Sequence, residues 1–137
     1  MSKESGLGWS VCSVDDASGT PRDIKNDFTN IQIATPRGVQ DVTGIDKSAY
    51  ERILLLADFS FTGNGIFNDA PNMGHDVFKT VTSTSVPRTL TLTVSGQTLA
   101  NEVLFTDYPL TRADSGELTY SVPGVLCDGN VPTWTTA

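Results

Sequence analysis

The residue best suited to chemistry is the one histidine of the chain, His75, which is followed directly by Asp76. A histidine next to a carboxylate suggests the base of a serine-hydrolase triad. The Gly-x-Ser-x-Gly turn that presents the serine in many such enzymes is absent from the sequence. Consecutive residues on a helix also point in different directions. We therefore interpret His75 as a half-exposed helical residue, and we predict no catalytic residues and no enzymatic activity.

Two groups of acidic residues offer other chemistry. Asp15, Asp16 and Asp23 could supply oxygen ligands to calcium, but the spacing of an EF-hand loop is absent and "DDASGT" is typical of a turn. Asp58 and Asp107 could form a general acid–base pair, but no pattern places them together. We therefore predict no metal site and no cofactor.

The cysteines and tryptophans lie near the two ends of the sequence. Cys12 and Cys127, with one histidine, cannot complete a four-ligand zinc site unless carboxylates take part. The N-terminus lacks the charged-then-apolar pattern of a signal peptide, so we expect a cytosolic protein with reduced thiols, both small and buried. Trp9 and Trp134 are predicted to cap the core, and an aromatic platform for sugars is the functional alternative.

The composition limits the class of protein. The chain has 137 residues, 38% hydrophobic and 18% charged, which fits one globular domain spanning 1–137. The net charge of −7 excludes a basic nucleic-acid reader, because an acidic surface is repelled by phosphate. No apolar run approaches the length of a transmembrane helix.

The stretch "LADFSFTGNGIF", residues 56–67, is the clearest structural signal. We predict one strand from about Ile53 to Phe67 with two unlike faces, because side chains alternate along a strand. One face holds the phenylalanines with Gly63 and Gly65 between them. The other face is small and polar and consists of Asp58, Ser60, Thr62 and Asn64.

The rest of the chain predicts more strands and one helix. Residues 9–14 and 28–36 read as strands, and three alternating segments follow in the C-terminal third. A short helix is expected after Asp69 as its N-cap, with Met73, Val77, Phe78 and Val81 on one side. Strands joined by short turns indicate a mainly β fold, an antiparallel β-sandwich or barrel with one flanking α-helix.

A long segment without clean periodicity, at about 36–52, is predicted to be a loop. Loops of this length inside compact domains are usually functional. Its charges alternate in sign, and they are Arg37, Asp41, Asp46, Lys47, Glu51 and Arg52.

Several phrases, in order, resemble the major tail proteins (tail tube proteins) of long-tailed bacteriophages. The likeness covers roughly residues 17–135 and includes "HDVF" at 75–78 and the closing strands at 102–134. The matching residues of the N-terminal half are Gly19, Asp23, Ile24, Asp41, Val42, Thr43, Gly44, Leu56, Asp58, Phe59, Ser60, Gly65 and Phe67.

This resemblance implies a structural protein of the virion tail, assembled in the host cytoplasm. Six copies would form a ring, rings would stack into a tube, and strands of all subunits would join into a barrel around a lumen. The six charged residues of the loop would contact the next ring, and the polar face of residues 58–64 would line the lumen. Implied partners are other copies, a tape-measure protein and tail-tip or terminator proteins, and DNA would pass through without specific binding.

Two alternatives remain open at this point. One is a head decoration or connector-ring protein of the virion, built on a similar small β fold. The other is a carbohydrate-binding β-sandwich that uses Trp9 or Trp134. Growth of a tube would separate the first from our prediction, and glycan binding would separate the second.

Overall fold

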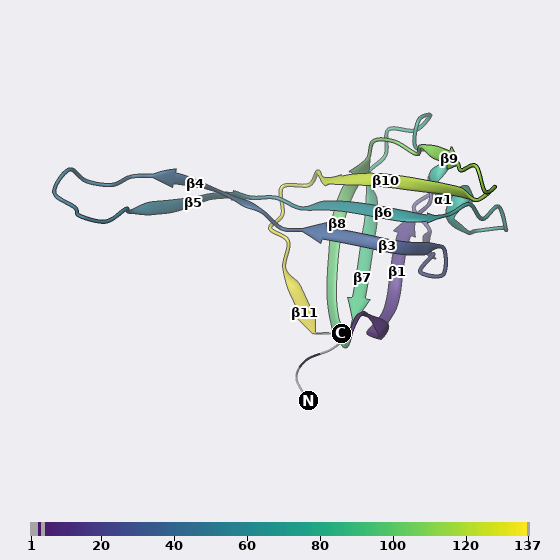
Figure 1. Ribbon diagram of the computed structural model, residues 1–137, viewed down its shortest axis with the longest axis horizontal. Helices are drawn as coiled ribbons and strands as arrows, with labels where there is room; N and C mark the ends of the chain where they lie inside the picture. The colour runs from purple at the N-terminus through teal and green to yellow at the C-terminus, as the bar shows by residue number, and fades with distance from the viewer. Residues whose placement is uncertain (1–2, 4, 137) are drawn as a thin grey trace.

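The computed structural model describes residues 3 and 5–136, and nine of the strands in these residues form one antiparallel sheet folded into two layers (Figure 1). In the front layer of Figure 1, β6 (Ser60–Ile66) lies between β3 (Phe28–Ala34) and β10 (Leu118–Leu126). The short strand β9 (Leu110–Arg112) pairs with one end of β10. The predicted mainly β, antiparallel fold is confirmed.

The back layer crosses the front layer at a steep angle (Figure 1). Its central strands are β1, β7 and β8, and β8 also pairs with the end of β10, which joins the layers. Two short strands, β2 and β11, extend its edges. The bounds are β1 (Trp9–Asp15), β2 (Pro21–Asp23), β7 (Arg88–Val94), β8 (Gln97–Phe105) and β11 (Trp134–Thr136), with a 3-10 turn, η1 (Gly6–Gly8), before β1.

The core fills the space between the two layers. Alternating side chains of β7 and β10 point into it, as their sequence pattern predicts. Aromatic rings from both layers meet edge to face, for example Phe28 with Phe61 at 5.8 Å between centroids. The buried apolar residues are Cys12, Val14, Ile24, Phe59, Phe61, Val77, Phe78, Leu90, Leu92, Leu99, Val103, Tyr120 and Val122.

The strand predicted at 53–67 is two strands with different partners. β5 (Arg52–Ala57) pairs with β4 (Arg37–Asp41), whereas β6 pairs with β3 and β10. The break comes at Asp58, whose amide donates to the carbonyl of Pro36 at 2.9 Å, and Phe59 then enters the core. A single continuous strand was therefore the wrong prediction, although the predicted alternation holds within β6.

The predicted loop at 36–52 is in large part a β-hairpin. β4 and β5 form a two-stranded ribbon that projects far from the body (Figure 1), and we call residues 37–57 the arm. The loop proper is confined to the tip, between Asp41 and Arg52. The sequence hid β4 because none of its side chains is buried, so "RGVQD" shows no alternation.

The helix α1 (Gly74–Phe78) is shorter than predicted and begins later. Met73, not Asp69, holds the N-cap position and makes no side-chain cap bond. The buried carboxylate of Asp27 instead accepts the amide of Gly74 at 2.7 Å. A Cβ at Gly74 would come within 2.9 Å of that carboxylate, so the glycine that weakens the helix in isolation permits this contact.

Candidate functional site

His75 and Asp76, the pair considered and rejected as catalytic in the sequence analysis, make separate contacts. The Nδ1 atom of His75 lies 3.2 Å from the hydroxyl of Tyr108, and the centre of its ring lies 4.8 Å from that of Phe67, with the two planes tilted by 51°. The carboxylate of Asp76 accepts the amide of Asn72 at 2.8 Å and the ammonium of Lys79 at 3.1 Å. These contacts make His75 a packed, partly buried helix residue, as the sequence suggested.

The other candidate carboxylates accept hydrogen bonds mainly from residues close to them in the sequence. Asp16 accepts the amides of Ser18 and Thr20 at 2.9 and 3.0 Å, and Asp23 accepts the ammonium of Lys25 at 2.8 Å. Asp58 and Asp107 each accept the amide of the following residue at 2.8 Å. The described part of the chain contains no group of three His, Cys, Asp or Glu residues that could hold a metal.

The cysteines lie in unlike surroundings. Both are free thiols; Cys12 is buried, as expected, but Cys127 is exposed, which corrects the prediction that both are buried. Burial, reinforced by nearby Asp23, raises the pKa of the Cys12 thiol to about 12, so this group stays protonated and unreactive.

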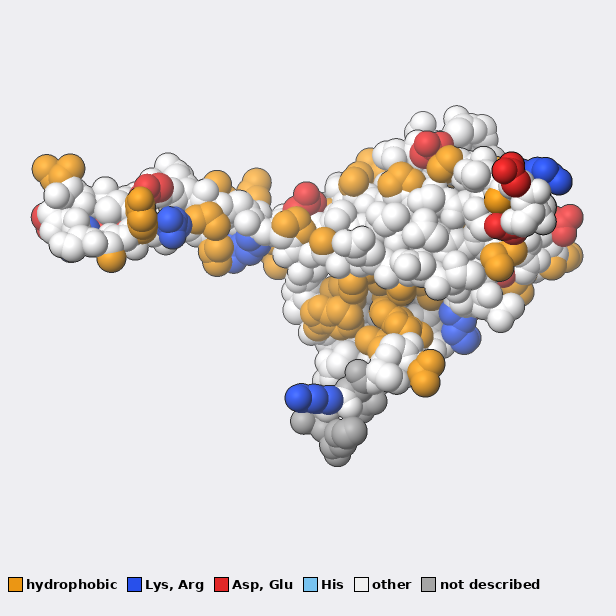
Figure 2. All heavy atoms as spheres, viewed as in Figure 1, with side chains coloured by type: hydrophobic (Ala, Val, Ile, Leu, Met, Phe, Trp, Pro, Cys, Tyr) orange, Lys and Arg blue, Asp and Glu red, His pale blue; other side chains and the backbone are white. Residues whose placement is uncertain are grey.

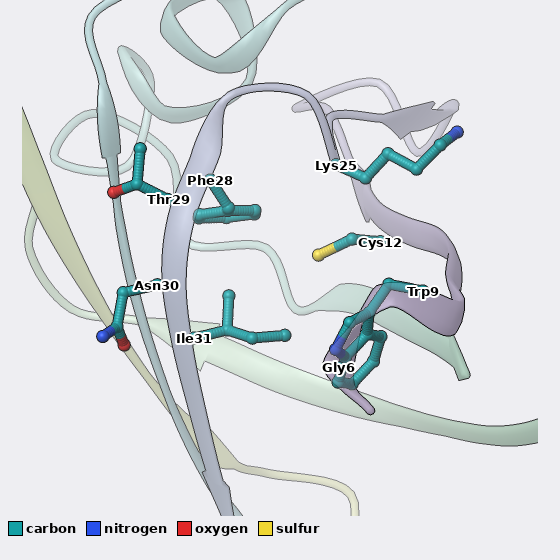
Figure 3. A pocket seen from close by; sticks show the side chains of 8 residues that line it. All are labelled: Gly6, Trp9, Cys12, Lys25, Phe28, Thr29, Asn30 and Ile31. Carbon is teal, nitrogen blue, oxygen red and sulfur yellow. The ribbon is translucent and has the colours of Figure 1, made fainter. Parts of the chain in front are cut away.

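Both tryptophans line depressions on one flank of the sandwich. Trp9 and Cys12 face Phe28 and Ile31 across an open gap of about 430 Å³ (Figure 3). Trp9 also shares a shallower depression of about 510 Å³ with Trp134, which is exposed rather than capping the core. This flank of the sandwich is therefore incompletely covered, and apolar side chains line part of it.

The outward face of the front layer is uncharged and mostly polar, with exposed Ile66 and Val125 toward the ends of β6 and β10. In the pairing register Thr62 stands between Gln32 and Pro123, and Asn64 stands between Asn30 and Ser121. In Figure 2 this face is a broad, mostly white area, the colour of the backbone and of side chains that are neither hydrophobic nor charged. We call it the polar face and define it as Asn30, Gln32, Ser60, Thr62, Asn64, Thr119 and Ser121.

The predicted lumen residues fall on or next to this face. Ser60, Thr62 and Asn64 belong to it, while Phe61 between them is buried, so the alternation predicted for this strand is correct. Asp58 lies outside it, exposed at the junction between arm and body. The neighbouring strands β3 and β10 contribute polar residues that sequence reasoning did not select.

The six charged residues of the arm have partners within the arm. Arg37 donates to the carbonyl of Leu55 at 2.9 and 2.8 Å, and Arg52 lies 4.6 Å from the centre of the Tyr50 ring. The Nζ of Lys47 is 3.8 Å from the carboxylate of Asp46.

The two remaining acidic residues of the arm shape its tip. Asp41 accepts hydrogen bonds from the hydroxyl and amide of Thr43, which hold the pKa of this carboxyl below its ordinary value. Glu51 accepts the amide of Gly44 at 3.3 Å. The arm also exposes large apolar side chains, among them Ile45, Leu54 and Leu56.

Two buried polar residues that sequence reasoning missed anchor the body. Asp27 binds Gly74 and also accepts the amide of Asn68 at 2.7 Å, which fixes the segment before α1. Arg88 is 2% exposed and reaches from β7 to the end of α1. A signal for Arg88 exists in the sequence, because alternation places it on the same strand face as Leu90 and Leu92.

Within the described residues, no helix is both long and apolar enough to cross a membrane. A scan of the sequence against models of known protein families finds no match. A search of curated proteins likewise finds no similar one.

Solved structures do share the fold. One is a chain from "Tail of empty GTA particle computed with helical refinement, C6 symmetry", where GTA denotes a gene transfer agent. It has a TM-score of 0.74 and 15% identity, and the match covers 98% of this chain and 99% of that one. Another is a chain from "Virion of native gene transfer agent (GTA) particle", with a TM-score of 0.69, 15% identity and coverage of 98% and 100%. The chain therefore shares, over nearly its whole length, the fold of a chain from the tail of a gene transfer agent particle.

Proposed function

We propose that the protein is a tail tube protein: a structural, non-enzymatic component that assembles into hexameric rings stacked as the tube of a virion tail. The observation that carries this proposal is the match to a chain of a C6-symmetric tail. The match covers 98% of this chain, so the arm cannot lie outside the matched region. Free strand edges in both layers give the subunit sites at which sheets of neighbouring copies can join.

The polar face suits the wall of such a tube. A conduit for DNA needs a lining that does not bind phosphate, and hydroxyl and amide groups without positive charge meet that need. Ser60, Thr62 and Asn64 lie on the central strand of this face, β6, and Asp58 adds negative charge at one end. DNA would pass during ejection without specific contacts, and a tape-measure protein would occupy the lumen before that.

Electron microscopy of the purified protein tests the proposal. At high concentration, or when seeded with tail tips, the chain should form hollow tubes with a regular axial repeat and six-fold end views. Single closed rings would instead support a connector, and binding only to capsids would support a head decoration protein. Binding on a glycan array without assembly would support a sugar-binding role for the depression beside Trp9 and Trp134.

The charged tip of the arm gives a test of ring stacking. We expect that the exchange Asp46→Lys with Lys47→Glu slows tube growth and changes its salt dependence, while the final amount of tube falls little. The reason is that exposed charges act mainly on association rates, and this pair keeps its mutual attraction when exchanged. Light scattering at several salt concentrations measures this effect, and an unchanged salt dependence would place the tip outside the contact between rings.

A further inference from the structure

The inward face of the back layer is uncovered at one end. Figure 1 shows the lower part of this layer extending beyond β3, and in Figure 2 hydrophobic side chains gather below the front layer. Directly opposed residues of neighbouring strands share a face, and Leu92, Leu99 and Trp134 form one such row across β7, β8 and β11. The two leucines are buried in the core, but Trp134 is 43% exposed. The core side of the back layer therefore continues past the point where the front layer ends.

The next positions on this face form an apolar depression. Val94 stands opposite both Trp9 and Gln97 in the pairing register. These residues and Trp134 line the depression of about 510 Å³, and the described residues around it carry no charge. Trp9 also borders the gap of about 430 Å³ next to Phe28 on β3 (Figure 3). We call Trp9, Val94 and Trp134 the shelf, and its chemistry suits contact with apolar side chains.

The front layer has an uncovered inward face at its opposite edge. Leu110 on β9 stands opposite Tyr120 on β10, and Tyr120 is buried in the core. The two residues therefore point to the same side of the front layer. Leu110 is nevertheless 45% exposed, so the back layer does not cover it. The core side of the front layer is thus open beside β9, as that of the back layer is open at the shelf.

The two open edges complement each other. The shelf lacks a front layer and the β9 edge lacks a back layer, so the β9 edge of one copy can lie over the shelf of another and close both. Strands β3 and β9 run in opposite directions, because three antiparallel pairings separate them. Copies in the same orientation therefore place β9 of one antiparallel to β3 of the other, which continues the ladder pattern of the sheet.

A second copy of the chain supplies what this site requires. The occupant has to offer apolar side chains on one face and unpaired backbone groups at its edge, because the gap beside the shelf is lined by residues of β3. Within the described residues β3 pairs with β6 alone and β9 with β10 alone, so both edges are free for such pairing. A head-to-tail contact between two different surfaces closes into a ring when it is repeated. Indole rings are also typical anchors of contacts between proteins.

We propose that the shelf of each copy is covered by the β9 edge of the next copy in the ring, so that neighbouring subunits share one hydrophobic core. Trp9 and Trp134 are the anchors on one side of this contact, and Leu110 belongs to the other side. This inference rests on the proposed tube assembly, and it adds that the sandwich of a single copy is incomplete. A monomer exposes both halves of the contact, and assembly buries them together.

Tryptophan fluorescence tests the covered shelf directly, because both tryptophans of the chain belong to it. On tube formation the emission should shift to shorter wavelength and quenching by acrylamide should fall, since both indoles leave water. Tubes with unchanged emission and unchanged quenching would overturn the inference while leaving the tube function intact. If the wild-type chain forms no tube even when seeded, the proposed function and this inference both fail.

Cross-linking identifies the surface that covers the shelf. In a Cys127→Ser background, where Cys12 is buried, Gln97→Cys and Leu110→Cys place one thiol at the shelf and one on β9. Figure 1 shows β9 and the turn between β7 and β8 at opposite ends of one chain. A short bis-maleimide should link tubes of the double variant into a ladder that ends at six copies, and tubes of each single variant should stay unlinked. A ladder that stops at dimers, or intact tubes without any ladder, would contradict the head-to-tail contact.

A substitution in the shelf gives an independent measurement. The change Trp134→Thr should lower the sedimenting tube fraction by about tenfold or more, because it removes an anchor from every contact in the ring. The melting temperature of the monomer should change little, since Trp134 lies outside the buried core. The matched control is Val125→Thr, which truncates a similarly exposed apolar residue on the front layer and should assemble like the wild type. Equal assembly of the Trp134 variant and the wild type would show that the shelf takes no part in the ring contact.

Discussion

Replacing Thr62 with lysine is expected to slow the passage of DNA through the assembled tube by about tenfold or more, while assembly proceeds normally. Thr62 lies at the centre of the polar face, between Gln32 and Pro123 on the flanking strands. The face carries no charged residue, so each lysine would add an unopposed positive charge. Six-fold repetition in every ring would turn a wall that does not bind phosphate into a series of phosphate-binding sites.

The matched control is Thr62→Gln, which lengthens the side chain without adding charge. Release of DNA from particles built with each variant can be followed by the fluorescence of a DNA-binding dye. We expect slow release for the lysine variant at low salt, recovery at high salt, and nearly normal release for the glutamine variant. Equal rates for all three proteins at low salt would show that another surface lines the lumen.

The sequence predicted the polar face well because strand alternation is a local property. Along β6, the buried residues Phe61, Gly63 and Gly65 alternate with more exposed polar residues such as Ser60 and Thr62. A period of two is the direct signature of a half-buried strand. What the sequence lacked was the pairing register. Only the register shows that Gln32 and Ser121 extend the same uncharged surface across three strands.

The arm could not be predicted because it breaks the usual relation between hydrophobicity and burial. "ILLL" at 53–56 reads as part of a core strand, yet all four residues are exposed in the single chain. The pattern indicates that these residues are buried somewhere, and the assembly proposed above is where we place that burial. In the proposed assembly, the hydrophobic pattern of these residues describes a state that one subunit alone does not reach.

The buried polar contacts were missed for a different reason. Asp27 and Gly74 are far apart in the chain, and nothing local to either residue indicates their hydrogen bond. The fold has to bring β3 and α1 together first. The sequence likewise gives no sign that the hydroxyl of Tyr120 is buried near Asp27. This hydroxyl has no hydrogen-bond partner among the described residues.

These features separate the tasks of the molecule among three parts. In the proposed tube, the body supplies a rigid frame and carries the negative charge, the polar face supplies a wall that does not bind DNA, and the arm supplies apolar contact area. Because the arm lies outside the core, its substitutions can alter assembly without unfolding the subunit. Substitutions in the frame should do the reverse, and Arg88 offers the sharpest case.

Replacing Arg88 with methionine is expected to lower the free energy of unfolding by about 2–4 kcal/mol. The guanidinium is buried and donates to the carbonyl of Val77 in α1, to the carbonyl of Asp15 at 3.5 Å and to the hydroxyl of Thr80 at 2.9 Å. Burial lowers the pKa of Arg88, and Asp16 and Asp15 oppose that shift. Methionine fills much of the space but leaves these buried acceptors without a donor.

Urea denaturation followed by tryptophan fluorescence measures the loss, and two variants frame it. Arg112→Met, on the exposed strand β9, should change stability by no more than about 0.5 kcal/mol. Arg88→Lys should fall between wild type and methionine, since one ammonium cannot span acceptors on both α1 and β1. An Arg88→Met protein as stable as the wild type would mean that α1 is held by the packing of Val77 and Phe78 and by the Asp27 carboxylate, without a contribution from Arg88.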